Sequence, residues 1–440
     1  MAAVLMGLLL ELLLVGQSSA MFQNPLTREE QGRLTSHDYA HVRDAFLDAC
    51  EDSSSEECSS GDSSGGEESS DSDDEGYFAG LMIGHWRAIK TRQLTYPPEL
   101  WISQPWEVMS PGEFEWWARF TPDEMIRLDD QLTLCPECIP NSVGRPPASR
   151  RLALTIVLMR LAGSDIGRPW RFIAEALQTN EQYLASTFAQ MIFTMGVAYR
   201  VLATCIDVKR ISTVLEPMAE AARRLGATVY PCVAAPDGNH RATTRCHRSF
   251  GNDAQQAFYQ GRLHSHGVSK HDIAFFDGTH VTFIGSAADN DLGRLKRSRQ
   301  VEAFEFLVLP DGTPVCMIGD QAYYGYPSQS VAAKPRGLID KMAQAWWSAN
   351  NTSRAISEDS FGLQVRLWPF VENRKQLKLY RKTRYSVRDL LLVVTVLTNA
   401  YVTVHGSQVT ATMKVDPPSM EEYFENANAR TIPDMHGPDP

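Results

Sequence analysis

The sequence predicts an α/β protein preceded by a helical unit, and three observations carry this prediction. Over 440 residues, a hydrophobic content of 43% is enough to bury a core in two or three structural units. Residues 150–200 have the apolar spacing of successive helices. From residue 228 onward, strand-like runs alternate with helix-like runs, which is typical of an α/β domain.

The first twenty residues allow several interpretations. The run from Val4 to Val15 is apolar and is followed by the small residues of QSSA, which resemble a signal-peptide cleavage site. However, Glu11 interrupts the run and no Lys or Arg precedes it. Residues 1–20 are therefore interpreted as an apolar leader, a short buried helix or a gene-model extension.

Residues 21–76 are predicted to be a mostly disordered acidic tail. Residues 51–75 contain eleven Asp or Glu and no Lys or Arg, so the formal charge of −11 belongs to this segment and the rest of the chain is formally neutral. The segment has no aromatic or branched aliphatic residue and cannot bury enough apolar surface to become ordered. It is either a plain solubilising tail or a substrate of acid-directed kinases.

Residues 77–149 are predicted to wrap irregularly over the later domains, with one short helix at 122–134. Cys135 and Cys138 have metal-ligand spacing, but no second pair closes a tetrahedral zinc site in the sequence. Scattered reduced thiols are the preferred interpretation of the cysteines. The alternative is a zinc site that Cys205, Cys246 and His247 complete.

Residues 150–227 are predicted to form a helical unit. The segment RRLALTIVLMRLAG is a helix closed by Gly163, Pro169 suits the start of a second helix, and Thr179 or Asn180 can cap a third. Three helices with a short middle one are the pattern of a helix-turn-helix unit. The alternative is a subdomain that only packs on its neighbour.

Residues 228–406 form the predicted α/β domain, and Asp-Gly pairs occur in it at Asp237, Asp277 and Asp311. Asp-Gly between apolar residues is a strong hairpin signal, so each pair could be a simple turn. Asp320 differs because it ends the apolar run PVCMIGD, at the strand end where α/β proteins build sites.

Glu358 is the fifth acid of interest. In a helix it would share the core-facing stripe with Phe361 and Val365. A buried carboxylate needs a partner, so the sequence leaves two solutions: an ion pair with Arg354 one turn earlier, or a bound divalent metal.

Six motifs in a fixed order carry a resemblance to a known family. Between residues 235 and 406 the chain contains, in order, APDGNH, FYQGRLHSHGV, GSAADNDLGRLKRS, IGDQAYYGYP, SRAISEDSFG and LTNAYVTVHG. This ordered set resembles the DDE-type transposases of the PIF/Harbinger group and the nucleases derived from them, over about residues 150–406. The resemblance implies a ribonuclease H-like mixed sheet flanked by helices.

The resemblance also implies an active site. It assigns the catalytic and metal-binding roles to Asp237, Asp320 and Glu358, with two Mg²⁺ or Mn²⁺ ions as cofactors. Supporting roles fall to Asp291, His264 and Arg354. The sequence departs from the family pattern at Asn239, Asn290 and Ser357, so we keep an inactive DNA-binding or scaffold protein as the alternative to a DNA endonuclease.

Basic residues near these acids are predicted to hold DNA. They are Arg171, Arg294, Lys296, Arg297, Lys375, Lys378, Arg381 and Lys382. The resemblance further implies a nuclear location and a separate Myb-like DNA-binding partner, and a homo-oligomer is possible. No membrane association is expected, because no later run reaches roughly 18 uncharged apolar residues. Residues 407–440 are predicted to be a disordered tail.

Overall fold

The computed structural model describes residues 104–135, 138–139, 148–163, 169–245, 251–287, 290–333, 341–373, 377 and 385–425. All of them belong to the unit that spans Leu94–Pro440. The expectations for residues 1–76, and for the side chain of Cys138, lie outside the described residues.

The described part of 104–135 is helical rather than irregular. It forms α4 (Pro105–Val108), α5 (Pro111–Ala118) and α6 (Pro122–Gln131), each with a proline in its first turn. In α6, which confirms the predicted short helix, Thr121 and Glu124 cap each other's backbone N–H groups. A short ribbon follows, in which β1 (Cys138–Ile139) pairs antiparallel with β2 (Ala148–Ser149).

The three helices predicted after residue 149 are present. They are α7 (Arg150–Leu161), α8 (Trp170–Ala176) and α9 (Glu181–Ala198). The Asn180 side chain caps α9 by accepting a 2.8 Å hydrogen bond from the Tyr183 N–H. Three further helices follow, α10 (Arg200–Thr204), α11 (Val208–Ser212) and α12 (Leu215–Arg224).

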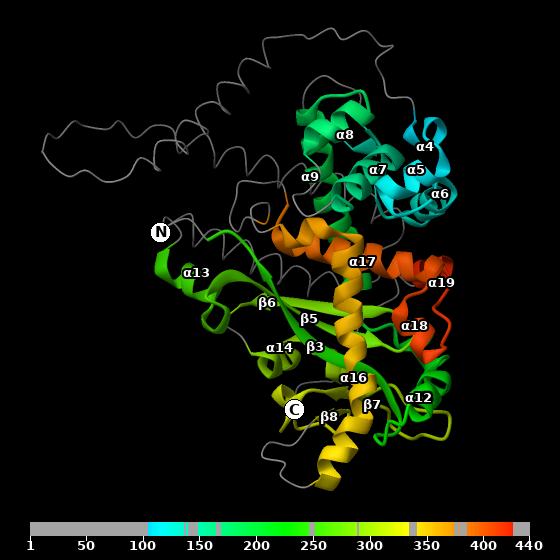
Figure 1. The fold of residues 1–440 in the computed structure, drawn as a ribbon, viewed down its shortest axis with the longest axis vertical. Coiled ribbons are helices and arrows are strands. Elements are labelled where there is room, and N and C mark those ends of the chain that lie inside the picture. The colour runs from blue at the N-terminus through cyan, green and yellow to red at the C-terminus, as the bar shows by residue number, and fades with distance from the viewer. Residues whose placement is uncertain are drawn as a thin grey trace, which may run out of the picture. The chain divides into compact units, whose positions relative to one another are not determined.

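A mixed sheet forms the centre of the α/β part (Figure 1). Its strands are β3 (Cys232–Ala242), β4 (Tyr259–Gln260), β5 (Ser265–Phe275), β6 (His280–Ser286), β7 (Cys316–Gly319) and β8 (Val331–Ala333). Strand β5 runs antiparallel to β3, β4 and β6, whereas β3, β7 and β8 are parallel to one another. The fold is therefore α/β, as predicted.

Helices flank this sheet (Figure 1). They are α13 (Gly251–Ala257), α14 (Asp291–Ser298), α15 (Gln300–Phe304), α16 (Lys341–Leu367) and α17 (Val387–His405), with single 3₁₀ turns η4 (Gly261–Leu263), η5 (Gln321–Tyr323) and η6 (Pro369–Glu372). Helix α16 packs against β3 and β5, and α17 packs against α9 and β6.

Helix α17 is long and apolar enough to cross a membrane by length and composition. However, 72% of its apolar window is buried inside the protein, which is the pattern of a core helix.

The prediction of a disordered segment from residue 407 is wrong for residues 407–425. They form α18 (Gln408–Met413) and α19 (Met420–Glu425). These helices bury their apolar side chains, with Met413 at 0% and Tyr423 at 1% exposure, so their burial offsets the entropy of ordering two short helices. Residues 426–440 lie outside the described part of the chain.

Two apolar clusters hold the described structure together. One joins α5, α6, α7 and α9 to α17, α19 and the end of α16. The other joins α12, α15 and α18 to strands β3, β5 and β7. Helices α11 and α12 thus pack with the sheet although they precede residue 227, while helices α5 and α6 share the core of α7 and α9.

Candidate active site

The pairing of β3 with β7 brings Asp237 and Asp320 to neighbouring positions. The parallel register aligns Ala234 with Met317, and each aspartate lies three residues further along its own chain. Both strands are buried up to this point, and both aspartates are partly exposed. Two carboxylates that are 83 residues apart in sequence therefore lie at neighbouring positions, where β7 ends beside the middle of β3.

The Asp237-Gly238 pair is not a turn. It lies inside β3, where Asp237 is aligned with Asp272 of β5 and Gly238 with His271. In contrast, Gly278 and Gly312, which follow the other two aspartates, each have a φ of 83°. The predictions that Asp277 and Asp311 belong to turns are confirmed.

The pKa of Asp237 is raised to about 6, mainly because the carboxyl group is buried. The nearby carboxylates of Asp320 and Asp291 add to the rise, whereas the Gly238 N–H and the charge of Arg354 oppose it. The two carboxyl oxygens accept hydrogen bonds from the Gly238 N–H at 2.7 Å and from the Ser357 hydroxyl at 3.3 Å. A bound cation would stabilise the ionised form of this carboxyl group.

Asp291 is the third carboxylate of this cluster. It opens α14 behind the N-cap Asn290 and lies so close to Gly238 that a Cβ there would be 1.8 Å from Asp291 Oδ1. Burial raises its pKa and the charge of Asp320 adds to the rise, while Arg294 and Arg262 lower it. A side chain at position 238 would displace this carboxylate from its present place.

Arg294 is not available to DNA, contrary to the prediction. Its Nη2 donates a 2.9 Å hydrogen bond to Asp291 Oδ1, and the residue is 4% exposed. The buried Arg294 guanidinium therefore neutralises part of the negative charge of the acid cluster. Helical spacing indicated a basic surface, but it could not show which basic residues of α14 point inward.

Glu358 faces solvent, so its predicted position on the core-facing stripe is wrong. Its side chain is 59% exposed, and Oε1 accepts a 2.9 Å hydrogen bond from Arg354 Nη2. The buried face of α16 contains Ser357 instead, one residue earlier. The ion pair, one of the two solutions that the sequence left open, is the one in this structure.

The donor set fits a divalent cation only in part. Asp237, Asp291 and Asp320 offer the hard carboxylate oxygens that Mg²⁺ and Mn²⁺ prefer, and their electrostatic interaction places them near one another. Yet, within the described residues, no three His, Cys, Asp or Glu side chains lie close enough to hold one ion. Metal binding therefore requires these carboxylates to close in, and Glu358 to turn away from Arg354.

Tyr323, which belongs to the motif that follows Asp320, lies behind the acids together with His271, which sequence reasoning did not single out. Tyr323 is buried, and the charges of Asp237, Asp291 and Asp320 add to a rise in its pKa that burial dominates. Its hydroxyl is 2.9 Å from His271 Nε2, and burial lowers the pKa of His271 to about 3. His271 lies in a strand-like run and resembled an ordinary core residue, so no sequence signal linked it to Tyr323.

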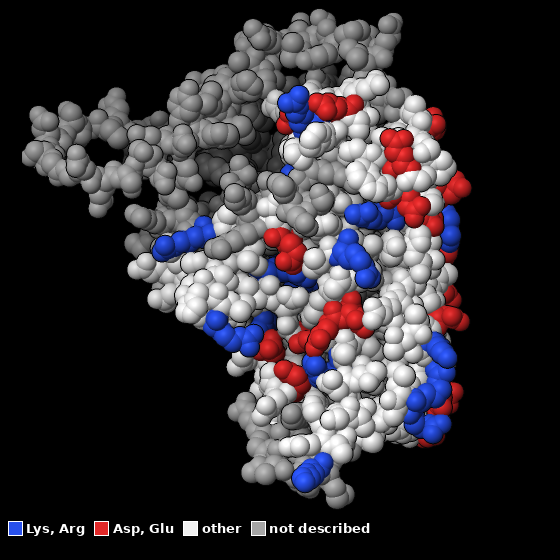
Figure 2. Space-filling view, in the orientation of Figure 1, with Lys and Arg blue, Asp and Glu red and all other residues white. Residues whose placement is uncertain are grey.

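The other predicted site residues have varied positions. His264 is exposed in a left-handed conformation and its Nδ1 is 3.3 Å from the Tyr259 hydroxyl. Arg171 is exposed and paired with Glu175, and Lys296 and Arg297 are exposed on α14. The remaining predicted DNA contacts lie outside the described residues: Lys375, Lys378, Arg381 and Lys382. In Figure 2, acidic atoms gather between α14 and α16 and basic atoms border them.

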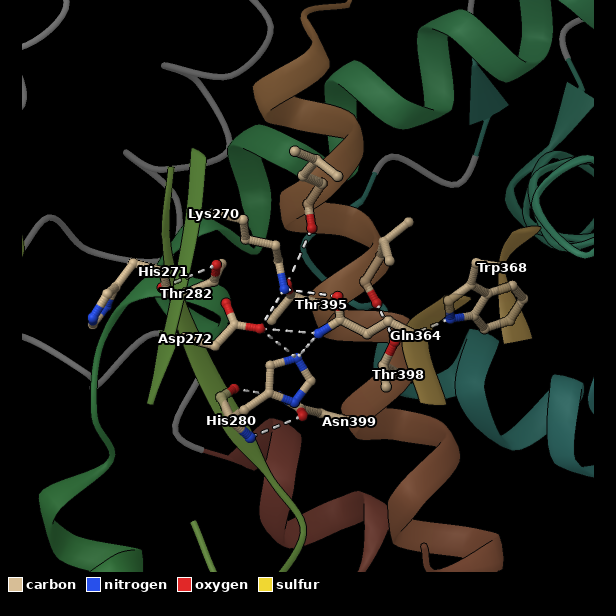
Figure 3. A network of polar contacts seen from close by, with 12 residues as sticks. Lys270, His271, Asp272, His280, Thr282, Gln364, Trp368, Thr395, Thr398 and Asn399 are labelled. Carbon is tan, nitrogen blue, oxygen red and sulfur yellow. Dashed lines mark hydrogen bonds and ion pairs between the residues drawn. The ribbon is translucent and has the colours of Figure 1, made fainter. Parts of the chain in front are cut away.

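A buried polar network lies next to the acid cluster (Figure 3). Lys270 Nζ donates to Asp272 Oδ2 at 2.6 Å and to Gln364 Oε1 at 2.7 Å, and all three side chains are at most 1% exposed. Gln364 Nε2 donates to Asp272 Oδ2 at 3.2 Å and is 2.5 Å from His280 Nε2. Asn399 of α17 then accepts from the His280 N–H at 3.1 Å and donates to the His280 carbonyl at 2.8 Å.

The network ties α16 and α17 to strands β5 and β6. Burial lowers the pKa of Lys270 to about 8 against the opposing charge of Asp272, so the lysine is still protonated at neutral pH. The pKa of Asp272 is lowered, because the charges of Lys270 and His280 outweigh the effect of its burial. The pair is therefore a buried salt bridge.

Comparison with protein-family models, with curated proteins and with solved structures finds no match to this chain.

Proposed function

We propose that the protein is a metal-dependent DNA endonuclease or transposase with a ribonuclease H-like fold, in which Asp237, Asp320 and Glu358 hold two Mg²⁺ or Mn²⁺ ions. The observation that carries the proposal is the register of β3 and β7, which brings Asp237 beside Asp320. The resemblance implies the first acid on the first strand, the second near the end of the fourth and the glutamate on a later helix. When the two-residue strands are left out, β3 is the first strand and β7 the fourth, and α16 follows them.

Each acid has a role in this proposal. Asp237 and Asp320 would hold the ions between them, and Glu358 would join after turning away from Arg354. Bound divalent ions would activate a water or a 3′-hydroxyl and stabilise the leaving oxygen of an in-line phosphodiester attack. Asp291 would keep Asp237 protonated more often in the absence of metal, since the two carboxylates repel each other.

The substrate of the proposed enzyme is DNA. Lys296 and Arg297 extend exposed from the last turn of α14, the helix that begins with Asp291 beside the acids. Their charge would hold backbone phosphates near the site in a salt-dependent way. A nuclear location and a Myb-like partner protein belong to the same proposal, on the resemblance alone.

A nicking assay tests the proposal. The full chain is incubated with supercoiled plasmid DNA and Mn²⁺, beside the variants Asp320→Ala and Asp311→Ala. The wild type and Asp311→Ala, whose carboxylate is exposed in a turn, should both nick the plasmid, and Asp320→Ala should fall to background. Equal nicking by wild type and Asp320→Ala would refute the catalytic assignment.

The second candidate is a DNA-binding or scaffold protein that retains the fold without cleavage. The Arg354–Glu358 ion pair favours it, because it neutralises the glutamate that the enzyme would need. Under this alternative, wild-type protein would retard DNA on a gel without nicking it, and Mn²⁺ would not raise its melting temperature.

A further inference from the structure

Helix α16 buries a polar stripe against the sheet. The stripe recurs at helical spacing and consists of Asn350, Ser353, Ser357, Ser360 and Gln364, all at most 4% exposed. A helix that packs on a sheet normally buries an apolar stripe there, and a buried polar group costs stability unless it is hydrogen-bonded. Attachment of the helix to the sheet alone does not explain why these buried positions are polar.

Three members of the stripe bond to the strand region at intervals of seven residues. Asn350 Oδ1 accepts from the Thr228 and Val229 N–H groups at 2.8 and 3.0 Å, just before β3. The Ser357 hydroxyl lies 3.3 Å from Asp237 Oδ2, in the middle of β3, and 2.9 Å from Arg354 O of its own helix. Gln364 bonds to the Lys270–Asp272 pair of β5. At 1.5 Å per residue, adjacent anchors are roughly 10 Å apart along the helix.

Directional bonds at these three heights define one position of the helix. Apolar side chains on the same helix, such as Ile356 and Leu363, attract without strong direction and would tolerate a small slide or rotation. A rotation by one residue position is about 100° and would break all three anchors together. The anchors thus determine which side chain of α16 meets Asp237 and which one faces outward beside it.

We infer that Asn350 and Gln364 are positioning residues: from the two ends of the stripe they set the height and rotation of α16, and so hold Ser357 against Asp237 and determine where Glu358, one residue later, faces. Neither residue touches the acid cluster through a described hydrogen bond. The link to catalysis rests on the proposed function, whereas the link to the position of α16 does not.

A double-mutant cycle tests the position of the helix without DNA or metal. Asn350→Ala and Gln364→Met remove the two end anchors, which are roughly 21 Å apart and share no partner among the described bonds. Independent sites that far apart have additive effects. If the anchors hold one common position, losing either one releases the helix and leaves less for the second substitution to remove.

The measured quantity is the shift of the urea midpoint, with the slope of the transition checked to be unchanged. We expect the double variant to shift by clearly less than the sum of the two single shifts. A double shift equal to or larger than that sum overturns the inference. Thr395→Val on α17 is the matched control, because the described bond of its equally buried hydroxyl lies within its own helix, to Leu391 O at 3.1 Å. Combined with Asn350→Ala, it should be additive.

A second measurement tests the link to the acids. Gln364→Met should lower kcat for plasmid nicking by about 100-fold, the order expected when reacting groups are misplaced by about 1 Å, with little change in KM for DNA. Thr395→Val should keep the wild-type kcat. A sub-additive cycle with an unchanged kcat in Gln364→Met would refute the positioning role.

These measurements separate the two proposals. A wild-type protein that does not nick DNA contradicts the proposed function, while the stability cycle still decides whether the anchors act together. If Gln364→Met does not fold, Asn350→Ala combined with Ser357→Ala gives a cycle from the other end of the stripe. A double shift smaller than the sum of the single shifts supports the inference, and one equal to or larger than that sum overturns it.

Discussion

Replacing Lys270 by methionine should be among the most destabilising single changes in the described structure. The substitution keeps the aliphatic stem and removes the ammonium group that lies 2.6 Å from Asp272 Oδ2. At an effective dielectric constant of about 20, the attraction between these charges is about 6 kcal/mol. The carboxylate left behind would be fully buried, with the Gln364 amide still donating at 3.2 Å.

Breaking a buried ion pair by removing one partner costs about 3–5 kcal/mol, because an uncompensated charge stays behind. Since a folded chain is stable by only about 5–15 kcal/mol, this is a large share of the total. Lys270→Met should therefore lower the free energy of unfolding by about 3–5 kcal/mol. The double variant Lys270→Met/Asp272→Asn should recover most of that loss, because neither partner then carries a charge.

The assay is urea unfolding followed by circular dichroism at pH 7, with the full chain and both variants at equal concentration. A loss below about 1 kcal/mol in Lys270→Met would mean that the lysine and aspartate do not form a charged pair, and would refute the reasoning. A double variant no more stable than the single one would also refute it.

Two further outcomes are expected. Gly238→Ala should lower the free energy of unfolding by about 1–3 kcal/mol, because the new Cβ would overlap Asp291; an unchanged urea midpoint would contradict that contact. Stability should also fall as the pH drops from 6.5 to 4.5. Burial lowers the pKa of His271 to about 3 and that of His280 to about 4, so the unfolded chain binds protons in this window that the folded chain does not. Each histidine lowers the free energy of unfolding by up to about 1.4 kcal/mol per pH unit. Below pH 6 the folded chain binds a proton at Asp237, whose pKa is raised, and this cancels the contribution of one histidine. A flat profile in urea titrations would contradict this.

The Asp-Gly pairs show how far local sequence signals reach. The turns at Asp277 and Asp311 follow from φ > 0 at the glycine, which is a local property. The same dipeptide at Asp237 forms strand because β5 pairs with it and β7 pairs with the residues just before it, and such long-range pairing is not visible in the dipeptide. Motif order was needed to separate this pair from the other two.

The errors in the prediction have local physical causes. Glu358 was expected on the buried stripe, but adjacent helix positions differ by about 100°, so choosing the wrong phase by one residue exchanges it with Ser357. The sequence around α18 and α19 contains Pro417 and Pro418 and only short apolar runs, which hides how well Met413 and Tyr423 pack. Burial of this kind depends on partners elsewhere in the chain.

The contact between α19 and the polar network has a consequence for folding during synthesis. The Tyr423 hydroxyl accepts a 3.1 Å hydrogen bond from Asn399 Nδ2, the amide that holds the His280 carbonyl. Domains generally fold in the order in which they leave the ribosome. The sheet strands emerge well before α19, so on a ribosome-bound chain the polar network lacks the Tyr423 hydroxyl until residue 423 has been released.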